Sequence, residues 1–115
     1  MTRSHKPIIW SLFAAGGTLS AFITPVMIVV TGLALSFGLL PAEALAYERM
    51  IGIVQHPIGK VLIFGAVFLP AWHAAHRLRI TAHDFGLRAD TAVAVICYSG
   101  AALVTLAAIY ALLSV

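Results

Sequence analysis

The sequence predicts an all-α membrane protein with three transmembrane helices and a short amphipathic interfacial helix between the first two. The first observation is composition: 62% of the 115 residues are hydrophobic and only 10% are charged, against about a quarter charged in soluble domains. A chain this short cannot bury so much apolar surface in a water-soluble core. The second observation is three long apolar runs, because a spanning helix needs about 20 residues. We therefore expect a single membrane domain over residues 1–115.

Each predicted element follows from a run or a break in this pattern. The first apolar run carries no charge, the second follows Pro57, and the third closes the chain. Between the first two runs, apolar residues recur at helical spacing while Glu43, Glu48 and Gln55 are mostly directed elsewhere, as in a helix lying on the membrane face. The expected spans are about 8–38, 58–82 and 91–114, and the expected interfacial helix is about 42–55.

The distribution of Lys and Arg predicts the orientation. Five of the seven basic residues would lie on one side, and the other side would hold only Arg49 and Lys60. The positive-inside rule then predicts a cytoplasmic N-terminus and a periplasmic C-terminus in a bacterial inner membrane. Because the basic residues flank apolar runs, we expect them to meet membrane lipid rather than nucleic acid. The five are Arg3, Lys6, Arg77, Arg79 and Arg88.

Small residues predict where helices pack closely. Gly16 and Ser20, and Gly17 and Ala21, are spaced four apart in the first span, and Gly100 lies in a similar small-residue stretch of the third. Such spacing lets helix backbones approach each other in a membrane. We expect Gly16, Gly17, Ser20 and Gly100 to form packing faces, some of them against a partner chain.

The stretch "LPAWHAAHRLRI" gathers polar residues at the end of the second span. Ionisable groups at membrane depth usually face a bundle interior, a cavity or a partner. Histidine exchanges protons near neutral pH, arginine binds oxygen anions, and aromatic rings wall a flat slot. A quinone requires all three, so we interpret the cluster as a quinone site at the cytoplasmic leaflet. The alternative is that Arg77, Arg79 and His76 act only as topology signals and interfacial residues.

Several stretches resemble the D subunit of bacterial quinol:fumarate reductase, a hydrophobic membrane anchor. They are "WSLFAAGGTLSAFITPVM", "PAEALAYER", "LPAWHAAHR" and "AHD", in that order along nearly the whole chain. The resemblance implies a menaquinol site near the iron–sulfur subunit. Its quinone-binding residues map onto Trp10, Phe13, Ala14, Gly17, His76 and Arg77.

The resemblance also implies the partners and cofactors. They are a second hydrophobic anchor, an iron–sulfur subunit and a flavoprotein subunit, with FAD and the iron–sulfur clusters held only by the last two. The shared cofactor would be menaquinone or menaquinol, and no haem and no metal ligand are expected in this chain. The chain itself would be a non-catalytic subunit. We match no position of the family to His73 and carry no role onto it. It could face the bundle and tune the site or lie at the lipid interface, and we favour the lipid interface.

Three other functions stay open. A succinate dehydrogenase anchor would carry haem b, and because the first and third spans contain no histidine, the second axial ligand would come from a partner. A small proton-coupled transporter would normally need an acidic residue within the spans, and none is present. A purely structural anchor would leave the quinone entirely to the partner.

Overall fold

The computed structural model describes residues 4–115, a range in which every regular element is a helix. Arg3, one of the residues used to predict the orientation, lies outside the described residues. Along the chain the elements are α1 (Lys6–Met27), the π-helix η1 (Ile28–Ala34), the 3-10 turn η2 (Ala42–Leu45), α2 (Tyr47–Gln55), α3 (Pro57–Asp84) and α4 (Asp90–Leu113).

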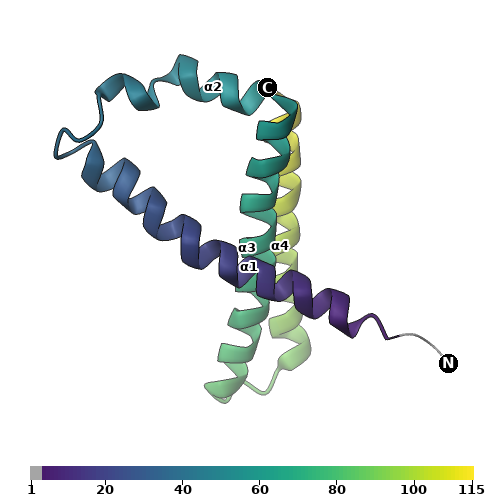
Figure 1. Cartoon of the computed structure of the whole chain (residues 1–115). Helices are drawn as coiled ribbons and strands as arrows, with labels where there is room; N and C mark the ends of the chain where they lie inside the picture. The colour runs from purple at the N-terminus through teal and green to yellow at the C-terminus, as the bar shows by residue number, and fades with distance from the viewer. Residues whose placement is uncertain (1–3) are drawn as a thin grey trace.

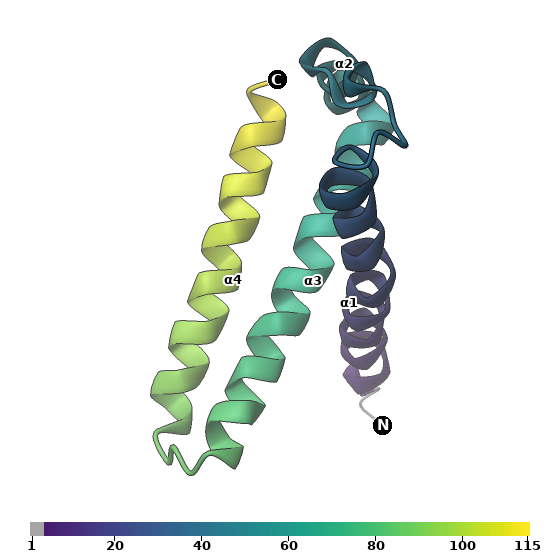
Figure 2. The same cartoon turned by 90° about the vertical axis from the view of Figure 1, so that its left-hand side faces the viewer.

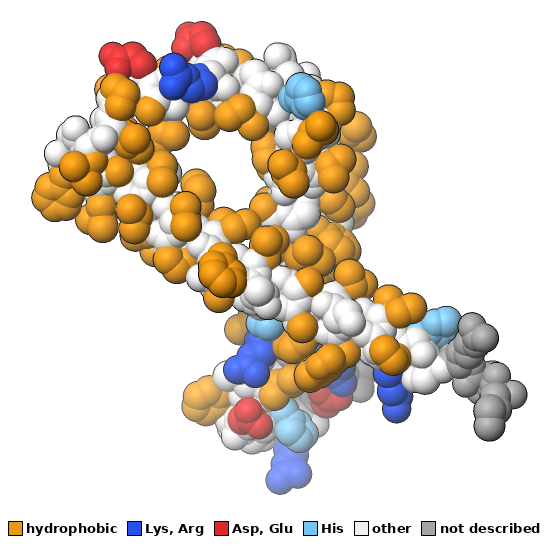
Figure 3. All heavy atoms as spheres, in the orientation of Figure 1, with side chains coloured by type: hydrophobic (Ala, Val, Ile, Leu, Met, Phe, Trp, Pro, Cys, Tyr) orange, Lys and Arg blue, Asp and Glu red, His pale blue; other side chains and the backbone are white. Residues whose placement is uncertain are grey.

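Three of these helices are long and apolar enough to cross a membrane, namely Lys6–Ala34, Pro57–Asp84 and Asp90–Leu113. The predicted fold class is therefore confirmed, and the chain is a multi-pass membrane protein. Charged side chains gather near α2 and near the opposite end of the molecule, while the surface between them is largely hydrophobic (Figure 3). This distribution fits two aqueous interfaces separated by a hydrocarbon layer.

Prolines and glycines set the helix ends. Pro7 and Pro57 occupy the first turns of α1 and α3, where a missing backbone N–H costs nothing. Pro25 removes a hydrogen bond within the first span, and the helix continues past Met27 as the wider η1. Gly86, with φ of +84°, reverses the chain after α3, a backbone conformation that other residues rarely adopt.

Helix α3 is the centre of the arrangement. It forms an antiparallel hairpin with α4 on one side and contacts α1 on the other (Figure 2). The two spans of the hairpin run nearly side by side, whereas α1 crosses α3 obliquely (Figure 1). The start of α1 and the α3–α4 turn lie toward the same end of the molecule.

The connection between the first two spans differs from the single helix expected over 42–55. Ala46 has an extended backbone (φ −59°, ψ 146°) and separates η2 from α2. A short 3-10 turn therefore follows Pro41, and a new helix starts at Tyr47. At the end of α2 the chain turns sharply into α3, and Gly59 lies against the Ile53 carbonyl with no room for a side chain.

Very little of the chain is buried by its own residues. The buried hydrophobic residues are all alanines, Ala34, Ala75 and Ala101, and many large apolar side chains stay exposed. Lipid and partner helices can cover such surfaces, and the residues that the chain itself buries are small ones.

Candidate functional site

The crossing of α1 and α3 rests on two adjacent glycines. Gly16 is buried, and a Cβ there would overlap the Leu69 carbonyl and lie 2.8 Å from the His73 Cβ. A Cβ on Gly17 would lie 2.6 Å from the His73 Cε1. The two glycines therefore form a notch that receives the His73 ring.

His73 faces α1, not lipid. The expectation of an interfacial His73 is wrong, because its Nδ1 lies 2.9 Å from the Phe13 carbonyl oxygen and its ring stacks on the Phe13 ring at 4.3 Å. A carbonyl oxygen can only accept, so His73 carries its proton on Nδ1 and donates it to Phe13. The sequence could not indicate this contact, because it depends on where α1 crosses α3.

Phe13, on which the His73 ring stacks, is the centre of an aromatic cluster. His76 meets the Phe13 ring edge-on at 4.9 Å, and Trp10 lies on the other side with its ring centroid at 5.3 Å. Phe13 and His76 are half-buried, whereas Trp10 is 65% exposed. The structure thus brings together the predicted residues Trp10, Phe13 and His76, with Gly17 one turn away along α1.

Helix α4 supplies two polar residues that the sequence analysis missed. Tyr98 Oη lies 2.8 Å from His76 Nδ1, and Trp72 Nε1 donates to Thr105 Oγ1 at 3.0 Å. The Trp72 and Tyr98 rings stack at 6.0 Å. A signal was available: Tyr98, Ala101 and Thr105 recur at helical spacing and form a polar and small stripe in an otherwise apolar span.

An ion pair closes the end of the hairpin. Arg79 donates through Nε and Nη2 to the two carboxylate oxygens of Asp90, at 2.9 and 2.6 Å. Its guanidinium carbon also lies 5.9 Å from the Tyr98 ring centroid. The sequence reasoning left Arg79 as a topology signal or interfacial cation; the structure shows a bidentate partner at the first turn of α4, where a carboxylate is favoured.

Four predicted site residues lie apart from this cluster. Arg77 is exposed, and within residues 4–115 it makes no hydrogen bond or ion pair. Ala14 is exposed on the Trp10 side of α1. Ser20 hydrogen-bonds its own helix at the Gly16 carbonyl. Gly100 has open space around its Cβ position, so the packing residue at this point of α4 is the buried Ala101.

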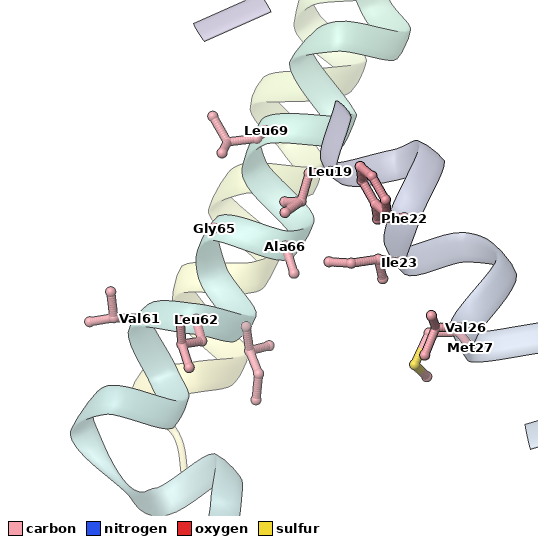
Figure 4. Close-up of a pocket in the computed structure, with 11 residues that line it drawn as sticks. Leu19, Phe22, Ile23, Val26, Met27, Val61, Leu62, Gly65, Ala66 and Leu69 are labelled. Atoms are coloured by element: carbon pink, nitrogen blue, oxygen red, sulfur yellow. The ribbon is translucent and has the colours of Figure 1, made fainter. Parts of the chain in front are cut away.

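An apolar cavity of about 690 Å³ lies on the far side of the crossing. It separates the second half of α1 from the first half of α3 and is lined only by apolar residues (Figure 4). In the space-filling view it forms part of an opening bounded by α1, α2 and α3 (Figure 3). No polar side chain converges there, so we do not assign it to the site. The lining residues include Leu19, Phe22, Ile23, Leu62, Ala66 and Leu69.

The arrangement can bind a flat ring and exchange a proton. Aromatic rings wall one side, and a histidine with one nitrogen already hydrogen-bonded presents its other nitrogen nearby. Among residues 4–115, no three His, Cys, Asp or Glu side chains come together as a metal site.

The fold and the site together define a small multi-pass membrane protein with a polar, aromatic cluster at one membrane face. Comparison with known proteins then gives the family. The family model for the D subunit of fumarate reductase matches residues 1–113, and the chain belongs to that family. It is a membrane anchor subunit of fumarate reductase and works within a multi-subunit complex.

Individual relatives agree in name and length. The fumarate reductase D subunit of Aliivibrio fischeri (strain MJ11) is 42% identical over 103 residues, covering 90% of this chain and 86% of the relative. The protein of the same name from Aliivibrio salmonicida (strain LFI1238) is 40% identical over 107 residues, covering 93% and 89%. That from Vibrio cholerae serotype O1 (strain M66-2) is 40% identical over 107 residues, covering 93% and 82%.

Proposed function

We propose that this chain forms one wall of a menaquinol-binding site in a quinol:fumarate reductase. In this proposal it lies in a bacterial inner membrane with its N-terminus in the cytoplasm and its C-terminus in the periplasm. Together with a second hydrophobic anchor, it attaches the flavoprotein and iron–sulfur subunits to the cytoplasmic face. Those two subunits would hold the FAD and the iron–sulfur clusters.

The observation that carries the proposal is the set of contacts around Phe13. Trp10 and His76, from two different helices, approach the same ring at 5.3 and 4.9 Å. This cluster lies in the half of the bundle where α1 begins and α3 ends, which is the half with most of the basic residues. The positive-inside rule assigns that half to the cytoplasm, where the iron–sulfur subunit would bind.

The residues present fit a quinone head group. Trp10 and Phe13 offer aromatic faces to its ring, and the His76 Nε2 is the ring nitrogen left for a quinone oxygen, because Nδ1 is held by Tyr98. Arg77 lies apart from the cluster but follows His76 in the chain and is exposed, and in this proposal its long side chain reaches the same oxygen and supplies a positive charge. Menaquinol, when bound, supplies two electrons and two protons.

The exposure of Trp10 indicates that the site is shared. A buried quinone ring needs a second wall, because ligand sites in proteins usually enclose most of the ligand. With 65% of Trp10 exposed, that wall would come from the second anchor or the iron–sulfur subunit. Ala14 is small and exposed on the Trp10 side of α1, so it leaves space for the ring beside Trp10, whereas the space beside Gly17 is filled by the His73 ring.

The decisive experiment compares quinol oxidation in assembled complexes. We expect Arg77→Leu to lower menaquinol-driven fumarate reduction at least about tenfold, because a charged hydrogen-bond donor is lost. The amount of assembled complex should stay unchanged, since Arg77 is exposed. Fumarate reduction driven by reduced viologen, which bypasses the quinol, should also stay unchanged. Arg88→Leu, an exposed arginine in the α3–α4 turn, is the matched control.

Each contrary result identifies another function. Normal quinol turnover in both Arg77→Leu and Trp10→Ala complexes would show a purely structural anchor, with the quinone bound elsewhere. Haem bands in the dithionite-reduced spectrum of the purified complex would instead favour a haem-bearing succinate dehydrogenase anchor. A chain that purifies without any partner would contradict the proposal altogether.

A further inference from the structure

We infer that Tyr98 of α4 is the positioning residue that orients His76 and remains its hydrogen-bond partner in both protonation states of the ring. The inference rests on the proposed quinol site and deepens it by naming a residue outside the predicted set. In this inference Tyr98 acts through His76, to which its hydroxyl is hydrogen-bonded.

The position of Tyr98 is fixed from three directions. Its hydroxyl lies 2.8 Å from His76 Nδ1, its ring stacks with Trp72 at 6.0 Å, and Arg79 approaches the ring at 5.9 Å. Arg79 and Trp72 are in turn held by Asp90 and Thr105 on α4. These contacts leave the phenol little freedom, so the His76 ring that it binds is also held.

The partners of the two histidines differ in a way that has chemical consequences. His73 donates Nδ1–H to the Phe13 carbonyl, and this partner can only accept. His76 faces a phenolic hydroxyl, which can both donate and accept. A neutral His76 accepts from the hydroxyl at Nδ1 in one tautomer and donates Nδ1–H to its oxygen in the other, and a protonated His76 also donates to that oxygen. The Phe13 carbonyl therefore fixes neutral His73 in the Nδ1–H tautomer, whereas the Tyr98 hydroxyl permits both neutral tautomers of His76 as well as its imidazolium.

This arrangement supports proton transfer at His76 Nε2. For Nε2 to accept a proton, His76 must first carry its own proton on Nδ1, which requires the Tyr98 oxygen as an acceptor. The Nε2 lone pair then takes the proton of one quinol hydroxyl, the proton of the second hydroxyl passes to water, and the two electrons pass to the iron–sulfur subunit of the proposed complex. The imidazolium returns that proton to water from Nε2 and regains its starting state, so protons and electrons balance.

The test is Tyr98→Phe, measured as menaquinol-driven fumarate reduction per assembled complex. The substitution keeps the ring that Trp72 and Arg79 contact and removes only the hydroxyl. We expect kcat to fall about tenfold, as for a lost hydrogen bond to a charged group, with KM for quinol changed less than about twofold. Tyr110→Phe, an exposed tyrosine on the same helix, is the matched control and should leave kcat unchanged.

A double variant separates positioning from general stability. In His76→Gln, the group that Tyr98 orients is already gone, so adding Tyr98→Phe should cause no further loss of kcat. If the fold-losses in kcat of the two single variants multiply in the double variant, the inference about Tyr98 is overturned while the proposed quinol site stands. The same holds if Tyr98→Phe has a wild-type kcat although His76→Gln is impaired. Wild-type quinol turnover in His76→Gln itself would instead overturn the role proposed for His76 in the site.

Discussion

Residues 72–79 of α3 make every cross-helix side-chain hydrogen bond found within residues 4–115, whereas residues 57–71 of the same helix make none. The first segment is hydrogen-bonded to α1 through His73 and to α4 through Trp72, His76 and Arg79. The second segment contacts its neighbours through apolar side chains and borders the open cavity.

The difference shows how a membrane chain fixes one region while leaving another adaptable. Apolar side chains gain little by leaving lipid for each other, so they do not hold helices at a defined distance. Polar groups have no water in the hydrocarbon layer and must find specific partners. Residues 72–79 and the helices hydrogen-bonded to them can therefore hold a site in one geometry. The Trp10–Phe13–His76 cluster lies in this region.

The largest effect is expected at the glycine notch. Gly16→Ala places a Cβ against the Leu69 carbonyl, which should destabilise the folded chain by about 1–3 kcal/mol through overpacking. Thermal melting of the purified complex would measure the loss. Gly32→Ala in the same span meets open space and should be neutral or slightly stabilising. Equal melting temperatures for the two variants would contradict the conclusion that the α1–α3 crossing depends on Gly16.

A smaller loss is expected when His73 is removed. His73→Ala deletes the bond to the Phe13 carbonyl and the stacked ring, together worth about 1–2 kcal/mol. The melting temperature should fall, and the yield of assembled complex with it. His83→Ala, near the exposed end of α3, is the control and should change neither. An unchanged melting temperature and yield in the His73→Ala complex would indicate that His73 lies at the lipid interface instead.

The hydrogen bond from Trp72 to Thr105 should contribute less to the stability of the complex than the His73 contacts do. Trp72→Phe keeps an aromatic ring near Tyr98 and loses only the donor to Thr105, at a cost of about 1 kcal/mol. Thr105→Val should cost a similar amount, and the double variant no more than either alone. A melting series of the three complexes checks this. Additive losses would show that the two side chains act independently.

The smallest effect on stability is expected in the apolar segment, residues 57–71 of α3. Leu62, which lines the cavity, is 67% exposed within the chain. Leu62→Ala should therefore change stability by less than about 0.5 kcal/mol in complexes where lipid covers that face. Melting in detergent and after reconstitution into bilayers would both be measured. A loss as large as that of Gly16→Ala would show that a protein partner packs there.

The sequence was sufficient for the spans and insufficient for the contacts between them. Hydropathy alone predicts three spans, and the spacing of Gly16 with Ser20 and of Gly17 with Ala21 predicts a close helix approach. The break at Ala46 could not be predicted, because alanine is a strong helix former and gives no signal that a helix ends. Which face of α3 meets which neighbour depends on crossing geometry, so the inward His73 and the Arg79–Asp90 pair emerged only from the structure. The stripe that contains Tyr98 was present in the sequence, but its partner on α3 was not.

The most direct test of the central claim is quinol oxidation by a complex carrying His76→Gln. The account predicts a loss of at least about a hundredfold in kcat, as expected when a proton acceptor is removed. Assembly and viologen-driven fumarate reduction should remain at the wild-type level. A His76→Gln complex that oxidises menaquinol as fast as the wild type would contradict the proposal that this histidine serves the quinol site.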